Sequence, residues 1–425
     1  MGLMQSRLDQ LAARIAGQVL PRGLASARAD ALARLSVMGL PTKRDEYWRY
    51  TDPSALNHAA ARTAAVFDAS DETPVFGEID RLKLVFVDGV FDAAASDPLD
   101  LAGVQIERLA AVNGPGHWAE ALYGALETAG QTPVSRPFAV LNSAFASDGV
   151  LIRVTARAAK PIALIYVHKS EGSDVMLHHC IRIESGAELT LLESGPAAAR
   201  FNAVLEVDLC EGARFHHIRA QGRDHDRHEI THLFARLAAH AIFKSFTLTA
   251  NGALTRNEAV IDIKGDDAVA HVAAAAVGDG RFHHDDTVFI THDALRCESR
   301  QVFKKVLKNG AVGVFQGKIL VKNGAQKTDG YQISQALLLD GDSQFLAKPE
   351  LEIYADDVKC SHGSTSGAID ETALFYLRSR GVPVNQAQAL LVLAFLTEAI
   401  AEIEEAAIAE DIRSRLEGWL ARHDR

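Results

Sequence analysis

The sequence predicts a mainly β protein in which a long core of stacked coils lies between two helical regions. Short segments with the periodicity of strands fill residues 138–366, turn signals separate them at a regular spacing, and helical patterns occupy both ends. These observations divide the 425 residues into an N-terminal helical region with a small hairpin at 1–137, a β core at 138–366 and a C-terminal helical region at 367–425.

The first region begins with a helical pattern. Apolar residues recur at helical spacing over residues 4–39, with Pro21 between two stretches and Pro41 after the second, where proline disfavours helix in the preceding residue. Residues 80–92 contain an Asp-Gly turn between two apolar runs and predict a hairpin. Residues 105–130 return to a helical pattern.

The core is recognised by alternation. In FNAVLEVDLC, residues such as Phe201 and Leu205 lie on one face of a strand, and polar residues such as Asn202 and Glu206 lie largely on the other. We therefore expect short strands of this kind to continue to about residue 360.

The spacing of the turns predicts how these strands are arranged. The gaps between successive glycines of one set are about 26, 40, 13 and 13 residues, near multiples of 13. One strand and one turn every ~13 residues, with two such units per coil, is what a flattened parallel β-helix produces. A β-sandwich is the alternative, although it would favour hairpin turns more strongly. The set comprises Gly186, Gly212, Gly252, Gly265 and Gly278.

The C-terminal region has its own start and stop signals. Asp370 is a candidate N-cap, Gly381 with Pro383 ends the helix that follows, and Asn385 is a candidate cap for the next. Residues 387–400 are more apolar than a free surface helix, so we expect them to pack on neighbouring elements or to dock on another protein.

Composition excludes some classes of function. The formal net charge of −11 argues against a general binder of nucleic acids or anionic membranes, because such proteins need a basic surface. The four cysteines are far apart and form no C-x-x-C, which favours reduced thiols in a cytoplasm. The first residues lack a signal-peptide core, and no apolar run approaches the ~20 residues of a membrane span, so we expect a cytoplasmic protein.

The stretch DDVKCSHG at 356–363 is the leading candidate for chemistry. On a strand, Cys360 and His362 project to the same side, and a thiolate and an imidazole both suit iron or zinc. Two ligands do not complete a tetrahedral site. The stretch is therefore an ordinary strand, a catalytic pair, or a metal site that another chain completes.

Histidine pairs offer a second candidate. Neighbours on a strand point to opposite faces, so no pair can hold one metal as a unit, although His178 with Cys180 is a possible same-face set. The alternative expectation is polar, hydrogen-bonded histidines on a solvated sheet face. The pairs are His178 and His179, His216 and His217, and His283 and His284.

Known catalytic motifs are incomplete or missing. His228, Glu229 and His232 match H-E-x-x-H, but they lie among strand patterns, where the side chains would be splayed apart. The segment GVFQGKIL lacks most of a P-loop, and neither G-x-G-x-x-G nor G-x-S-x-G occurs. A carbohydrate-active enzyme on a β-helix remains an alternative, although such proteins are usually exported.

Three segments resemble the SufB/SufD family of iron–sulfur cluster assembly scaffolds. They are LPTKRDEYWRYTDPSAL at 40–56, SRQVFKKVLKNGAVGVFQGKILVKNGAQKTDGYQISQALLLD from residue 299, and PELEIYADDVKCSHGSTSGAIDETALFYLRSRGV up to 382. The chain resembles the SufD branch more closely, because it is short for SufB and lacks the added cysteine cluster of that branch.

The resemblance implies a right-handed parallel β-helix with helical regions at both ends. It also implies a non-catalytic subunit that pairs with a SufB-like chain through the β-helix end and binds a SufC-like ATPase through the C-terminal helices. Such a complex builds a transient iron–sulfur cluster, receives iron, and can bind reduced flavin, while the isolated chain holds no tightly bound cofactor. An interaction module that stabilises SufB and SufC without contacting metal is the alternative.

The resemblance also assigns roles to residues. His362 matches the histidine at the SufB–SufD interface, and Cys360 matches a nearby cysteine, so both are expected to be transient iron or cluster ligands that SufB completes. The docking region for SufC is expected to include Leu374, Phe375, Tyr376, Leu390 and Phe395. Without its partner, an open β-helix end with unpaired strand edges would favour a homodimer.

Overall fold

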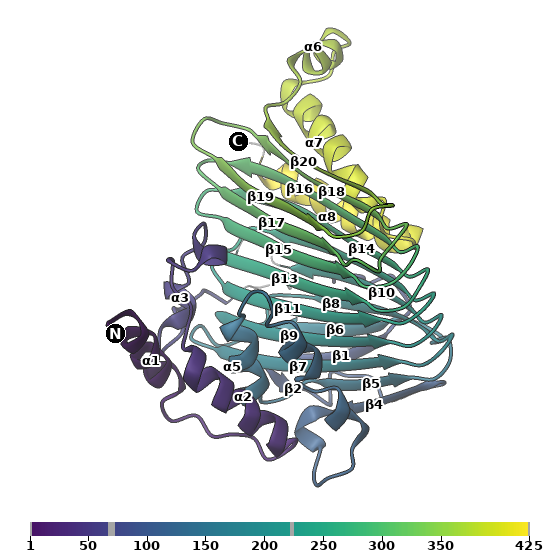
Figure 1. Ribbon diagram of the computed structural model, residues 1–425. Helices are drawn as coiled ribbons and strands as arrows, with labels where there is room; N and C mark the ends of the chain where they lie inside the picture. The colour runs from purple at the N-terminus through teal and green to yellow at the C-terminus, as the bar shows by residue number, and fades with distance from the viewer. Residues whose placement is uncertain (1, 67–72, 222–224, 424–425) are drawn as a thin grey trace.

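Two parallel sheets face each other along the whole length of the molecule (Figure 1). The structure, a computed structural model, describes residues 2–66, 73–221 and 225–423. Strands make up 40% of it and helices 24%, and the chain forms a parallel β-solenoid of about seven turns with helices at both ends. The predicted fold class is therefore confirmed.

Each turn of the solenoid contributes one strand to each sheet. Phe215 pairs with Phe243, and Phe243 pairs with Ala270 one turn further along. In spatial order, sheet A contains β2 (Val90–Phe91), β1 (Leu82–Val87), β6 (Ile162–Val167), β8 (Glu188–Ser194), β10 (Arg214–Gln221), β12 (Ile242–Ala250), β14 (Val269–Asp279), β16 (Glu298–Lys308), β18 (Asp329–Leu338) and β20 (Lys359–Gly367). Sheet B contains β19 (Gln344–Ile353), β17 (Val312–Val321), β15 (His283–His292), β13 (Leu254–Ile263), β11 (His228–Leu237), β9 (Arg200–Leu209), β7 (Asp174–Ile183), β5 (Val150–Val154), β4 (Val104–Arg108) and β3 (Asp100–Leu101).

The sheets are covered on both faces over much of their length. One apolar layer fills the space between the sheets, a second lies between sheet B and the N-terminal helices, and a third lies between sheet A and the C-terminal helices. Every residue of β9 is buried as a result. The strand predicted at FNAVLEVDLC forms, and its polar residues Asn202 and Glu206 are buried too, because helix α5 (Pro137–Phe145) covers this face.

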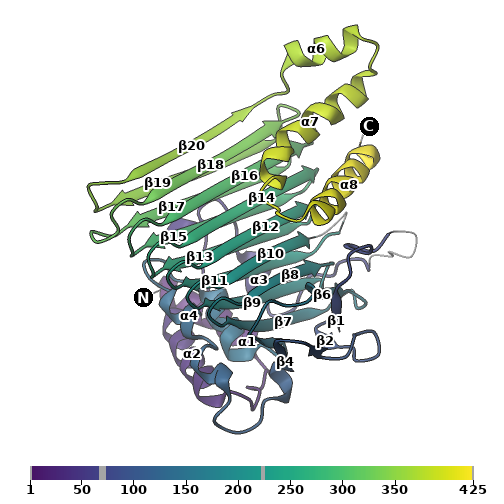
Figure 2. The same ribbon diagram turned by 90° about the vertical axis from the view of Figure 1, so that its right-hand side faces the viewer.

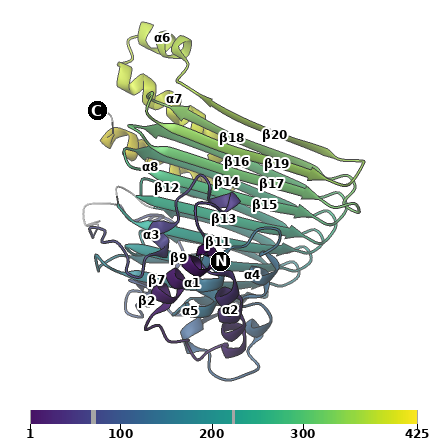
Figure 3. The same ribbon diagram turned by 60° about the vertical axis from the view of Figure 1, so that its left-hand side comes forward.

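The N-terminal helices lie on the outer face of sheet B, towards the end of the solenoid where the chain begins (Figure 3). The helices expected at 4–39 form, and so does the hairpin expected at 80–92, whose first strand also pairs in parallel with β6. The longer helices here are α1 (Gly2–Ile15) and α2 (Ala25–Met38), and the short ones are α3 (Ser54–Asn57) and α4 (Ala125–Ala129).

Residues 105–130 differ from the expected helical pattern. They form β4, two 3-10 helices at Leu109–Ala111 and Trp118–Ala121, and α4. Gly114 and Gly116 have φ of 85° and 93°, values that lie outside the right-handed α-helix. A continuous helix therefore cannot pass through them.

The C-terminal region contains α6 (Glu371–Ser379), α7 (Val384–Ile400) and α8 (Ala406–Arg422). Asp370 caps α6 by accepting hydrogen bonds from the backbone N–H groups of Thr372 and Ala373. Helix α7 starts after Pro383, so Asn385 lies in its first turn and not at the cap. Helix α7 packs on β14 and β16, which explains the apolar character of 387–400, while α6 stands away from the sheets (Figure 2).

None of the helices in the described part of the chain combines the length and the hydropathy that crossing a bilayer requires.

Candidate functional site

The C-terminal end of the solenoid is open. Within the described residues, β20 is the last strand of sheet A and pairs with β18 alone, while β19 is the last strand of sheet B and pairs with β17 alone. Each therefore presents an edge of unpaired backbone groups, which is a template for pairing with another chain. At the other end, β2 and β3 close the sheets with short antiparallel strands.

Cys360 and His362 both lie on this terminal strand β20. The thiol of Cys360 is half-buried and lies over Gly330 of β18. A Cβ added to Gly330 would be 3.2 Å from Sγ of Cys360. Because Cys360 packs with Ile319 and Leu351 between the sheets, residues of its parity point inward. His362 shares that parity but remains exposed, since no further turn of the solenoid covers it. The same-side arrangement expected from the sequence is present at the rim of the open end.

Ionisation of Cys360 is disfavoured in the isolated chain. Partial burial raises the pKa of its thiol, and the nearby charge of Asp329 raises it further, against a backbone hydrogen bond from Gly330 that lowers it. A thiolate, and not a thiol, is the metal ligand. An arriving cation would therefore have to stabilise the charged form.

His362 ends a row of inward-pointing side chains on sheet A. The pairing of the strands places Gln332 directly beneath His362, and Gln301 directly beneath Gln332. The apolar Val272 lies beneath Gln301, and below it Ser245 and His217 continue the row and hydrogen-bond to each other at 2.9 Å. The open end therefore leads into a partly polar interior.

The residues expected to dock SufC divide into two groups. Phe375 and Tyr376 on α6 are 73% and 55% exposed, and Leu390 on α7 is 46% exposed. Leu374 is only half-exposed, and Phe395 is half-buried, with its ring 4.8 Å from the ammonium group of Lys304 on sheet A.

A second group of metal-binding residue types lies far from the open end, under the N-terminal helices. His178, Cys180 and Glu206 are fully buried, and their ligand atoms lie within 4.8 Å of one another. The carboxylate oxygens of Glu206 accept hydrogen bonds from the backbone N–H groups of Gly124 and Glu127 at 2.6 and 2.9 Å. Oε2 also lies 2.9 Å from Nε2 of His178. Those contacts satisfy the carboxylate, so the group anchors α4 to sheet B. The sequence indicated His178 with Cys180, but the strand that supplies Glu206 could not be identified by spacing.

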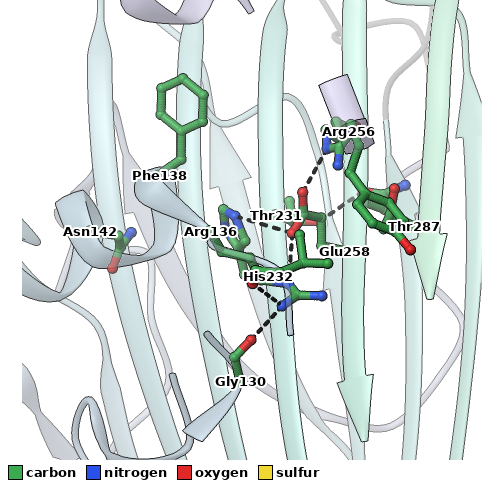
Figure 4. A network of polar contacts seen from close by, with 12 residues as sticks. Gly130, Arg136, Phe138, Asn142, Thr231, His232, Arg256, Glu258 and Thr287 are labelled. Carbon is green, nitrogen blue, oxygen red and sulfur yellow. Dashed lines mark hydrogen bonds and ion pairs between the residues drawn. The ribbon is translucent and has the colours of Figure 1, made fainter. Parts of the chain in front are cut away.

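A buried ionic network holds the N-terminal region on the outer face of sheet B (Figure 4). Arg256 donates a hydrogen bond to Glu258 at 2.6 Å, and Arg136 forms an ion pair with the same carboxylate at 3.0 Å. Burial lowers the pKa of His232 to about 4, so this imidazole is neutral beside Glu258 at neutral pH. Arg136 also hydrogen-bonds to the carbonyl of Gly130. The network is structural in character.

The H-E-x-x-H segment is splayed along β11, as expected. Glu229 points between the sheets and bonds to Arg227 and Gln221, whereas His228 and His232 have the opposite parity. The segment cannot act as the metal and base site of a protease.

The histidine pairs do point to opposite faces, but the expectation of a solvated face is wrong. His178 lies against Glu206 on the outer face, and His179 lies 3.2 Å from the hydroxyl of Tyr166 on the inner face. Both are buried. The helical regions and the second sheet cover the faces that a single strand pattern left open.

Sequence reasoning missed a buried triad between the sheets. The ammonium group of Lys305 lies 2.5 Å from Oδ2 of Asp286 and 2.9 Å from Nδ1 of His284. Burial alone would raise the pKa of Asp286, but His284 and Lys305 lower it well below its usual range. The i, i+2 spacing of His284 and Asp286 was the one available signal, and the partner from the other sheet had none.

Comparison with known proteins agrees with this architecture. The family model for the SUF system FeS cluster assembly, SufBD core domain, matches residues 166–395, which is more than half of the chain. The iron-sulfur cluster assembly protein SufD of Escherichia coli (strain K12) is 29% identical over 396 residues, covering 91% of this chain and 90% of that protein. A SufBD family protein of Synechocystis is 28% identical over 409 residues, covering 92% and 90%, and SufD of Bacillus subtilis is 26% identical over 288 residues, covering 65% of each chain. The chain therefore belongs to the SufBD family of iron–sulfur cluster assembly proteins.

Proposed function

We propose that this chain is a non-catalytic scaffold subunit that pairs with a SufB-like chain through its open end and binds a SufC-like ATPase through its C-terminal helices in the cytoplasm. His362 and Cys360 contribute transient ligands to iron or a nascent cluster at the seam. The SufB-like chain supplies the remaining thiolates.

The exposed imidazole of His362 on an unpaired terminal strand carries this proposal. Imidazole and thiolate both suit iron, and the two residues occupy one side of one strand. Two ligands at a contact between chains hold a cluster only while the contact is intact. A cluster that must later leave needs a site of this kind.

The C-terminal helices provide a mechanical link from the ATPase to the seam. Helix α7 packs on β14 and β16, and Lys304 of β16 lies 2.5 Å from Glu398 of α7. Strand β16 pairs with β18, which in turn pairs with β20. Movement of α6 and α7 on ATP turnover would therefore reach the strand of His362 through hydrogen-bonded neighbours.

The test is assembly by the three-subunit complex with His362→Ala. Copurification with the SufB-like and SufC-like chains, anaerobic reconstitution and an absorption spectrum would measure cluster formation. We expect the variant to retain both partners and its fold but to lose most cluster absorption. The matched control is His58→Ala, which removes an exposed histidine in the N-terminal region.

The alternatives give other outcomes. Normal cluster formation by His362→Ala would favour a module that stabilises its partners without contacting metal. Glycan turnover by the isolated chain would favour a carbohydrate-active enzyme. In the absence of the SufB-like chain, we expect the unpaired edges of β19 and β20 to associate with a second copy, which a concentration-dependent mass would reveal.

A further inference from the structure

The side chain of Gln332 is buried directly behind His362 but has no hydrogen-bond partner within the described structure. It is fully buried, and among the described residues neither Oε1 nor Nε2 has a hydrogen-bond partner. The large majority of buried side-chain polar groups in proteins have a hydrogen-bond partner, so each exception calls for a physical reason. For Gln332, the residues around the amide indicate a partner.

The amide extends across the interior to a glycine of the opposite sheet. An added Cβ at Gly317 on β17 would lie 2.4 Å from Oε1 and 2.7 Å from Cδ of Gln332. Real Cβ atoms do not approach another atom this closely, so another residue at this position would require the amide to shift. Gly317 thus leaves a space of the right size for the carboxamide.

Gln332 is also the register partner of His362. Strands β18 and β20 pair in parallel, and neighbouring strands lie about 4.8 Å apart. The two side chains share one parity, and a glutamine is long enough to reach an imidazole on the next strand. A histidine that binds a metal through one nitrogen almost always donates its other N–H to a carboxylate, a carbonyl or water.

We propose that Gln332 is a positioning residue for His362, whose imidazole donates its second N–H to Oε1 of Gln332 when a metal is held at the open end. This hydrogen bond fixes the tautomer and the rotation of the ring, so that the free nitrogen faces the seam. The inference rests on the proposed role of His362.

A titration of the three-subunit complex with Co(II), used as a spectroscopic probe, tests this inference. The Co(II) absorption that is lost in His362→Ala is the signal of the site at His362. Gln332→Met keeps the length and volume of the side chain but removes the hydrogen-bond acceptor. We expect Co(II) to bind at this site about 10- to 100-fold more weakly in this variant. Gln332→Glu keeps an acceptor oxygen and should bind at least as tightly as the native chain.

Gln301→Met is the matched control. Gln301 has the same side chain, the same parity and complete burial, and its amide likewise has no partner in the described part of the chain. It lies one turn deeper and is not adjacent to His362. We expect its affinity for Co(II) to be unchanged. Urea unfolding of both methionine variants checks that each is folded.

Three results would overturn the inference. They are unchanged affinity in Gln332→Met, an equal loss in Gln301→Met, or weaker binding in Gln332→Glu. These outcomes can be told apart from failure of the proposed function. If His362→Ala leaves Co(II) binding and cluster assembly intact, the proposed function fails and this inference fails with it; if only the Gln332 variants are without effect, the role of His362 stands.

Discussion

Arg136 and Glu258 form an ion pair in which Nε of the guanidinium lies 3.0 Å from Oε2 of the carboxylate, and their side chains are only 1% and 4% exposed. Arg256 binds the other oxygen of the same carboxylate at 2.6 Å. Arg136 comes from the N-terminal region and the other two come from β13, so the carboxylate joins the region to the solenoid.

Neutralising this carboxylate should destabilise the fold strongly. Glu258→Gln leaves two buried guanidinium groups without their shared anion, and removing one partner of a buried pair costs about 3–5 kcal/mol. The free energy of unfolding in urea measures the loss. Glu184→Gln is the matched control, because Glu184 also lies against two arginines, Arg153 at 2.7 Å and Arg182 at 3.2 Å, but at a partly exposed site. We expect a loss below about 1 kcal/mol there, and equal losses would contradict this account.

The same carboxylate should make stability depend on acid pH. Burial alone would raise the pKa of Glu258, but Arg256, His232 and Arg136 lower it to about 2. Since its pKa in the unfolded chain is near the ordinary value of about 4.3, the stabilisation is complete above that pH and is lost as the pH falls towards 2. Unfolding free energies at a series of acid pH values should fall less steeply for Glu258→Gln than for the native chain. Parallel curves would show that other carboxylates dominate.

The exposed aromatic residues of α6 should matter for partner binding and not for folding. Phe375 and Tyr376 are 73% and 55% exposed on a helix that stands away from the sheets (Figure 2). Aromatic anchors of interfaces commonly contribute about 2 kcal/mol or more, so the double alanine variant should bind the SufC-like chain at least about 30-fold more weakly, with an unchanged melting temperature. Calorimetric titration measures the affinity. The control is Val90→Ala, since Val90 is 67% exposed on the hairpin, and an equal loss there would argue against a specific docking site.

Much of the architecture could be predicted because the structural repeat of a solenoid produces a matching repeat in its sequence. The two-residue alternation placed β9, the ~13-residue spacing of turns indicated two strands per coil, and Asp370 marked the start of α6. The same alternation sent the members of each histidine pair to opposite faces. These features depend on neighbours along the chain.

The rest depends on contacts between turns, which the sequence does not specify. Successive members of the row from His217 to His362 are between 27 and 31 residues apart, because turn lengths vary. No fixed period therefore identifies Gln332 as the neighbour of His362. Burial of the outer faces was missed for a similar reason. A strand pattern does not show that helices from both ends of the chain will cover it.

Alkylation of cysteines provides a direct test of the open end as a contact surface. Cys180 and Cys297 are buried, whereas Cys360 at the rim and Cys210 on the side of the solenoid are partly exposed. Burial raises the thiol pKa of both exposed residues, so the reaction should be run at a pH of about 8.5, where enough thiolate is present. In the dilute isolated chain, mass spectrometry after reaction with iodoacetamide should find carbamidomethyl groups on Cys210 and Cys360 alone.

Addition of the SufB-like chain should then separate these two thiols. Pairing along β19 and β20 would cover the rim, so the alkylation rate of Cys360 should fall while that of Cys210 stays the same. Cys210 thus controls for reagent and pH within a single sample. If Cys360 reacts at the same rate in the complex, the rim is not the contact, and the half-site of Cys360 and His362 has no partner to complete it.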